Sequence, residues 1–160
     1  MPASSKIEIN SATFKSNGLF AGLSEVELKE LIGFFQVRQW PRGGRIINEG
    51  ERGGVLYIVY QGGVDILKQM VSREGERAEK ITALREGDTF GETVLLDQQP
   101  HSASVVANTD SIVLALDNAD LHRVDPHIYA TMLANLTHEV SRRLRTTDQY
   151  YAMALFSNHE

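Results

Sequence analysis

Paired glycines at nearly even spacing constrain the fold of this chain more than any other feature. Gly43-Gly44, Gly53-Gly54 and Gly62-Gly63 fall ten and nine residues apart, with short runs rich in β-branched residues between them. This rhythm is typical of short antiparallel strands joined by tight turns. The strand-like runs are RIINEG, VLYIVY and VDILKQM, then ITAL after a polar hairpin SREGERAEK, and later SASVVA and SIVLAL. We predict about eight strands, enough for a double-stranded β-helix or jelly roll.

Helical signals flank the strands. Ser24 is followed three residues later by Glu27, a capping box in which each side chain satisfies a backbone donor of the other. With the apolar spacing that follows, this predicts a helix over about 24–34. Residues 1–18 are polar and are expected to be loose. The fold class is therefore mainly β with flanking helices.

A second, longer helix is predicted at the C-terminal end. Asp125-Pro126 suits a helix start, with aspartate as the cap and proline in the first turn. Apolar residues recur at helical spacing at Tyr129, Leu133, Leu136, Val140, Leu144, Tyr151 and Leu155. A helix of roughly 25 to 30 residues would span about 40 Å, longer than a roll of this size needs. We expect it to pair two subunits in a homodimer, the alternative being a helix packed wholly on its own domain.

The overall composition fits one globular domain and excludes several classes of protein. The chain has 160 residues, 42% of them apolar and 23% charged, a net charge of -5 and no cysteine. The negative charge gives no support for binding a nucleic-acid backbone, and the lack of cysteine excludes a disulfide scaffold. The opening lacks an apolar signal core, and no run approaches the ~20 apolar residues of a membrane helix. We expect a cytoplasmic protein with no membrane or direct nucleic-acid partner.

The order of these segments resembles the cyclic-nucleotide-binding domain family, which includes bacterial catabolite-activator regulators and regulatory subunits of cAMP-dependent protein kinase. The capped helix is followed by IINEGERGGVLYIVYQGGVDIL, then REGDTFGETVLLDQQPHSASVVA, then the long helix. The resemblance covers about Leu19 to Thr147. Gly50, Gly62, Gly87 and Gly91 fall on the family's turn positions. It implies a roll over 19–125, a dimerisation or lid helix over 126–157, and a small-molecule ligand such as cAMP or cGMP.

The segment from Phe90 to Ala103, which we call the cassette, looks like the family's phosphate-binding segment. TFGETVLL predicts a tight turn leading into one helical turn, whose free amides and positive dipole form an anion site. Gly91 would let the backbone approach a ligand closely. The resemblance implies that Glu92 accepts a hydrogen bond from the ribose 2′-OH, with Phe90, Thr93, Ser102 and Ala103 as further binding residues. The alternative is that Glu92 only favours the start of a short helix.

His101 departs from the family pattern, which has an arginine here to pair with the cyclic phosphate. Imidazole is mostly neutral at pH 7 and lacks the planar fork of arginine. Three interpretations are open. His101 becomes protonated when the anion arrives, giving weak binding that improves at acid pH; or the pocket has drifted to another ligand or none, leaving a dimeric interaction scaffold; or another basic group supplies the charge.

The base of the ligand would also need contacts. In the bacterial regulators, small hydroxyl residues after an Arg-Arg-Leu run in the long helix touch the adenine. Here Arg142-Arg143-Leu144 leads to Thr147, the best match in register, with Asp148 where a second hydroxyl would be expected. The alternative is that Thr147 is an ordinary surface residue. The chain stops at Glu160 without a helix-turn-helix, so we expect its output to pass through a protein partner or its own dimer.

An enzymatic function is not expected. Cupins share this broad architecture and bind a metal through histidines on neighbouring strands. The five histidines here are mostly outside the predicted strands and include no close His-x-His pair: His101, His122, His127, His138 and His159. No nucleophile-elbow or P-loop spacing occurs. We predict no catalytic residue, no metal and no cofactor, with a cupin-type metal enzyme as the more remote alternative.

Overall fold

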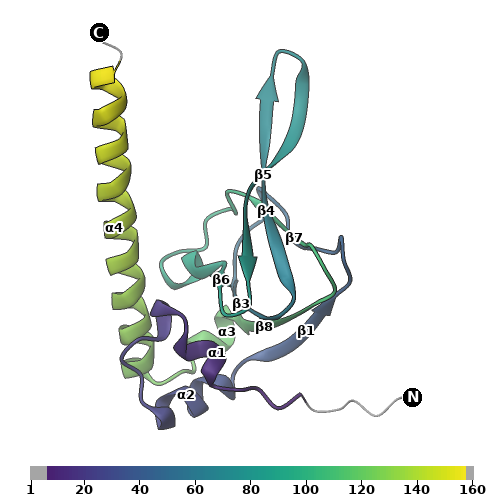
Figure 1. The fold of residues 1–160 in the computed structure, drawn as a ribbon. Coiled ribbons are helices and arrows are strands. Elements are labelled where there is room, and N and C mark those ends of the chain that lie inside the picture. The colour runs from purple at the N-terminus through teal and green to yellow at the C-terminus, as the bar shows by residue number, and fades with distance from the viewer. Residues whose placement is uncertain (1–6, 158–160) are drawn as a thin grey trace.

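A computed structural model describes residues 7–157, with side chains to residue 155, and places the strands in two sheets (Figure 1). One four-stranded sheet has the order β1-β8-β3-β6 and the other β2-β7-β4-β5, with all pairs antiparallel. The strands are β1 Gln36–Trp40, β2 Arg45–Ile47, β3 Val55–Gln61, β4 Gly63–Ser72, β5 Gly75–Arg85, β6 Thr89–Phe90, β7 Ser104–Ala107 and β8 Ser111–Asp117. The predicted mainly β roll with a long C-terminal helix is confirmed.

Strand β3 is buried on both faces, which explains its unbroken apolar run. Leu56 and Ile58 point into a core shared with the helices, whereas Tyr57 and Val59 point into the core between the sheets. Successive side chains of a strand alternate between its faces. A strand with one solvent face would show alternating polar residues instead. The sheet that contains β3 thus lies between the interior of the roll on one face and a helical layer on the other.

The helical layer contains α1 Ala12–Lys15, η1 Gly18–Phe20, α2 Glu25–Ile32 and α3 Asn118–Leu121. The capping box at the start of α2 is present, with the Glu27 amide donating to Ser24 Oγ at 3.2 Å and the Ser24 amide donating to Glu27 Oε1 at 3.3 Å. Phe14 in α1 is fully buried. The expectation of a loose segment over 1–18 therefore does not hold for α1, and residues 1–6 lie outside the described part.

The polar hairpin expected over 72–80 is present and forms the outer part of β4 and β5. Ser72 pairs with Gly75, and the ladder continues inward from there. This outer part is exposed and projects from the body (Figure 1). Hydrogen bonding between two polar strands leaves no periodic apolar signal, which is why the pattern did not predict how far these strands extend.

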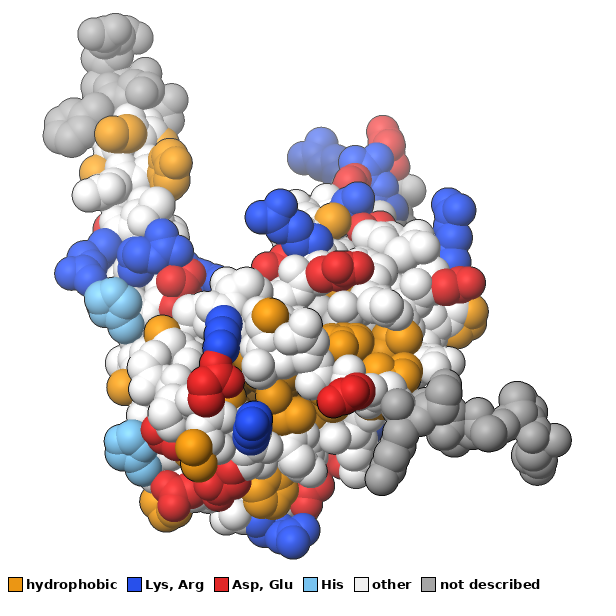
Figure 2. Space-filling view, turned by 60° about the horizontal axis from the view of Figure 1, so that its bottom comes forward, with side chains coloured by type: hydrophobic (Ala, Val, Ile, Leu, Met, Phe, Trp, Pro, Cys, Tyr) orange, Lys and Arg blue, Asp and Glu red, His pale blue; other side chains and the backbone are white. Residues whose placement is uncertain are grey.

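The last helix, α4, covers Pro126–Ser157 and has 32 residues, slightly more than expected. Its start is capped by Asp125, whose Oδ1 accepts from the His127 amide at 2.8 Å. The buried residues are Ile128, Met132 and Leu136, and Tyr129 and Leu133 of the predicted apolar row are partly buried against the same core. The outer part of α4, beyond Arg143, stands clear of the body (Figures 1 and 2). Within residues 7–157, none of the helices combines the length and apolar character needed to cross a lipid bilayer.

Candidate functional site

The cassette begins at a glycine that the backbone requires. Gly91 has φ +71°, in the left-handed region, and a Cβ added there would lie 2.4 Å from the Val55 carbonyl oxygen. Its close neighbour in the structure is thus strand β3, and the close approach of a ligand to Gly91 stays a prediction. Phe90 is buried and stacks on Tyr57, with ring centroids 4.9 Å apart. Phe90 therefore packs in the core, and Gly91 forms the turn that leads to Glu92.

The turn continues into a short 3-10 helix, η2, over Glu92–Leu95. Val94 and Leu95 are buried and anchor this helix to the core, whereas Thr93 is exposed. The Val94 amide donates to the Gly91 carbonyl at 3.2 Å. The single helical turn after glycine that the sequence predicted is present; anion binding by its amides stays a prediction.

Glu92 lines a cavity of about 600 Å³ between the roll and α4. The cavity is bounded by η1, by β5 and β6, and by Glu139 and Arg143 of α4. Its volume falls in the range of about 300–1,000 Å³ that is usual for small-molecule pockets. Burial raises the pKa of the Glu92 carboxyl, and the Glu139 charge adds to this, while its own backbone amide and Arg143 oppose it. The ionised form of Glu92 is thus poorly solvated in this structure.

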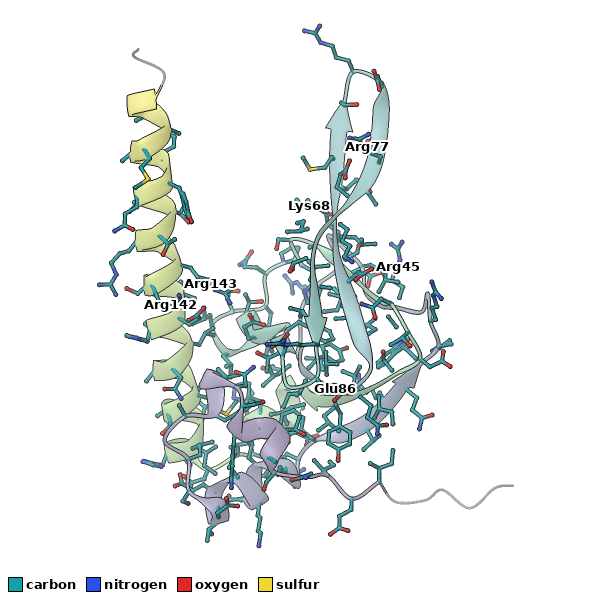
Figure 3. All side chains as sticks on the ribbon, in the orientation of Figure 1. Arg45, Lys68, Arg77, Glu86, Arg142 and Arg143 are labelled. Atoms are coloured by element: carbon teal, nitrogen blue, oxygen red, sulfur yellow. The ribbon has the colours of Figure 1, made fainter. Side chains whose placement is uncertain are left out.

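Arg143 enters the cavity from the middle of α4 (Figure 3). Its Nε donates to Glu139 Oε1 at 2.9 Å, and Arg142 donates to both oxygens of the same carboxylate at 3.0 and 2.8 Å. Hydrogen bonds from Arg142 and then Arg143 lower the pKa of Glu139 to about 2. This places an arginine and a permanently ionised glutamate opposite Glu92, a pairing that the sequence analysis did not identify.

His101 lies at the other end of the cassette, against the β2–β3 loop. Its amide donates to the Glu51 carbonyl at 2.8 Å, and its carbonyl accepts from the Gly50 amide at 2.8 Å. The imidazole packs on Gly53, where an added Cβ would lie 3.3 Å from His101 Cε1. Burial lowers the pKa of His101, and the charge of Glu51 offsets this only in part. His101 is thus a half-buried, neutral side chain near pH 7.

A lysine from strand β4 contacts the cassette beside His101. Lys68 Nζ donates to the Ser102 carbonyl at 2.6 Å and to Glu49 Oε1 at 2.7 Å. Glu49 also accepts from the Gln69 amide at 2.9 Å, and the hydrogen bond from Lys68 is the main cause of its lowered pKa. The chain therefore brings an ammonium group to the cassette from a strand that is distant in sequence.

The remaining predicted residues are spread along the site. Ala103 is half-buried, and Ser102 is exposed with its carbonyl bound by Lys68. Thr147 is exposed on α4, one turn beyond Arg143, whose carbonyl accepts from its hydroxyl at 3.0 Å. Of the predicted site residues, Glu92 alone is among those that line the cavity. Across residues 7–157, no three His, Cys, Asp or Glu side chains gather in a way that could hold a metal ion.

The fold and the site define a class of β-roll domain in which a small-molecule cavity lies between the roll and a helix that follows it. The chain belongs to the cyclic nucleotide-binding domain family. The family model described as "Cyclic nucleotide-binding domain" matches residues 37–124, more than half of the sequence.

Individual relatives agree with this assignment. The chain is 34% identical over 134 residues to the cyclic AMP receptor protein of Thermus thermophilus, covering 84% of this chain and 60% of the relative. It is 30% identical over 113 residues to a cAMP-dependent protein kinase regulatory subunit of Blastocladiella emersonii, covering 71% of this chain and 27% of that protein. The crystal structure of Thermus thermophilus catabolite activator protein superposes with a TM-score of 0.76 at 32% identity, covering 88% and 64% of the two chains. This chain therefore spans about 60% and about a quarter of the two curated relatives.

Proposed function

We propose that this domain binds a purine cyclic nucleotide, cAMP or cGMP, and acts as a regulatory module without catalytic activity of its own. The observation that carries the proposal is the position of Glu92 on the wall of the cavity under α4. A ligand hydroxyl that donates to Glu92 would compensate for the burial that raises its pKa. The ribose of a cyclic nucleotide has such a hydroxyl.

The same cavity supports a route from ligand to output. Because Arg143 and Glu139 line it from α4, a bound ligand contacts both the roll and the helix. A ligand can shift a conformational equilibrium only by its difference in affinity for the two states. The proposed signal is therefore a change in the preferred position of α4, passed to a protein partner or within a dimer.

A ligand-free scaffold is the second candidate, and His101 favours it. The side chain at the position of the family's arginine is packed on Gly53, and burial lowers its pKa. A neutral imidazole offers a cyclic phosphate no charge. In this case the domain would act through its dimer interface alone.

Calorimetric titration with cAMP and cGMP at pH 7.5 separates the two candidates. We expect binding by the unmodified domain and a loss of about ten- to a hundredfold in Glu92→Gln, because a hydrogen bond to a charged group contributes about 1.5–3 kcal/mol. Absence of heat at millimolar nucleotide would contradict the proposal.

The Glu92→Gln variant should also be at least as stable as the unmodified protein. A carboxyl with a raised folded-state pKa destabilises the fold once pH exceeds that value, and glutamine removes this cost.

The pH dependence of these titrations has a definite sign. Binding of an anion favours protonated His101, so affinity rises as pH falls through the pKa of His101. The rise begins at the pKa of His101 in the complex, which the anion raises, and ends at the pKa in the free domain, which burial lowers from its ordinary value of about 6.5. The rise should be absent in His101→Asn. Affinity that stays the same from pH 7.5 to pH 6 would contradict this expectation.

The outer part of α4 supports a homodimer. Val140, Leu144, Tyr151 and Leu155 are 39%, 58%, 68% and 49% exposed, and their spacing of four, seven and four residues places them on one face. An exposed apolar row of this length is typical of a helix seam between subunits. Thr147 lies between Leu144 and Tyr151 in the same row, so a ligand base at Thr147 would lie at the seam.

We expect Leu144→Glu to convert a dimer into a monomer in sedimentation at micromolar concentration, because it places a charge in the apolar seam. Val26→Glu is a matched control, since Val26 is 76% exposed on α2, away from this row. Truncation after Asp125 is a poorer test because it removes Ile128 and Met132 from the core. A monomeric unmodified protein, or a dimer that survives Leu144→Glu, would contradict the seam.

A further inference from the structure

The ammonium group of Lys68 is held at a defined point beside the cassette. It donates to the Ser102 carbonyl at 2.6 Å and to Glu49 Oε1 at 2.7 Å (Figure 3). These contacts use two of the three N–H donors of an ammonium group. The third donor can be given to an anionic oxygen without breaking either contact. The lysine is thus fixed in place with binding capacity left.

The position of Lys68 in its strand directs it to the interior of the roll. Val64 is fully buried in the core between the sheets, and Ile66 packs against that core. Residues two and four positions apart on a strand share a face. Lys68 therefore continues the inward face of β4, at the end where the apolar core stops. Lysine is more common on the outward face of a strand, where its side chain lies in solvent.

Other cations beside the cassette are less well placed. His101 packs on Gly53 and is mostly neutral at pH 7. Arg52 pairs with Pro100 through the backbone, but its side chain is exposed to solvent. The ammonium group of Lys68 reaches the cassette backbone directly.

We propose that Lys68 carries the positive charge for the ligand's phosphate, in place of the arginine that His101 replaces. This rests on the proposed nucleotide-binding function. Lysine binds phosphate as a point charge and does not need the geometry of a fork. Glu49 has two effects on this role: it holds the ammonium group in position, and its own charge opposes an incoming anion.

These two effects give a test with opposite signs. We expect Lys68→Met to weaken binding of cAMP and cGMP about ten- to a hundredfold at pH 7.5, through loss of a charge-assisted bond. Glu49→Gln should leave affinity equal or severalfold tighter, because it removes a negative charge while its amide oxygen can still accept from Lys68. If Lys68 only tied β4 to the cassette, both variants would weaken binding, because Lys68→Met breaks the tie and the amide of Glu49→Gln holds the ammonium group less firmly than the carboxylate does. Arg52→Met is the matched control. It also removes one positive charge beside the cassette, and we expect it to leave the affinity for cAMP and cGMP unchanged.

Each other outcome contradicts a specific part of the account. Equal weakening by Lys68→Met and Glu49→Gln, or a loss confined to Arg52→Met, would overturn the role of Lys68 while leaving nucleotide binding intact. If the unmodified domain fails to bind and His101→Arg binds, Lys68 does not replace the arginine and the proposal is wrong. If neither binds, the nucleotide-binding function itself fails. Thermal unfolding of all variants would verify that each is folded.

Discussion

His101→Arg should raise the affinity for cAMP by about ten- to a hundredfold at pH 7.5. The backbone of His101 is fixed by its hydrogen bonds to Gly50 and Glu51, so an arginine would enter the cassette in the same frame. Its guanidinium adds a permanent, bidentate partner for the phosphate, and a charge-assisted contact of this kind contributes about 1.5–3 kcal/mol. Isothermal titration of the two proteins measures the difference directly.

The control for this gain in affinity is the double variant that combines His101→Arg with Glu92→Gln. If the arginine acts through the cassette, loss of the Glu92 carboxylate should remove much of the gained affinity, since both groups would hold one ligand. Unchanged affinity in His101→Arg would contradict the assignment of this position to the phosphate. A gain that persists fully without Glu92 would indicate nonspecific attraction of the anion.

Gly91→Ala should cause a large loss of stability. Alanine at φ +71° incurs about 1–3 kcal/mol of backbone strain, and a Cβ at 2.4 Å from the Val55 oxygen requires the backbone to move. We expect a loss of about 3 kcal/mol or more in the free energy of unfolding, measured by urea denaturation. Because the turn carries Glu92, nucleotide binding should fall with it.

Two other glycines separate the contributions of strain and collision. Gly43 has φ +83° and an added Cβ meets nothing within 4 Å, so Gly43→Ala should show the strain alone. Gly54 has neither a positive φ nor a neighbour within 4 Å and should tolerate alanine with little change. Equal losses in Gly91→Ala and Gly43→Ala would show that the contact with Val55 carries no energetic weight.

Local signals predicted those parts of the fold that depend on neighbouring residues. The capping box at Ser24 and Glu27, the aspartate cap at Asp125 and the turn at Gly91 are each encoded within a few positions. The buried face of α4 was harder to assign, because the helix is apolar on more than one side and only the fold shows that Ile128 and Met132 enter the core. The polar hairpin of β4 and β5 was predicted, but without apolar alternation the extent of its strands was not.

The candidate site shows the same division. The motif around Glu92 was visible in the sequence, and the structure places this residue on the cavity. Lys68 and Glu49 were missed because their contacts join residues 19 and 34 positions apart. One signal could have indicated Lys68, namely its place two residues after Ile66 on the inward face of a predicted strand. Arg143 stood out in the sequence only as part of the Arg142-Arg143-Leu144 run, and only the packing of α4 shows that it faces Glu92.

A crystal structure of the domain grown with cAMP or cGMP tests the central claim most directly. The account predicts the nucleotide between the roll and α4, with a ribose hydroxyl on the Glu92 carboxylate, a phosphate oxygen on Lys68 Nζ and the base toward Thr147. A nucleotide bound away from Glu92, or a cavity that contains none at millimolar concentration, would contradict it.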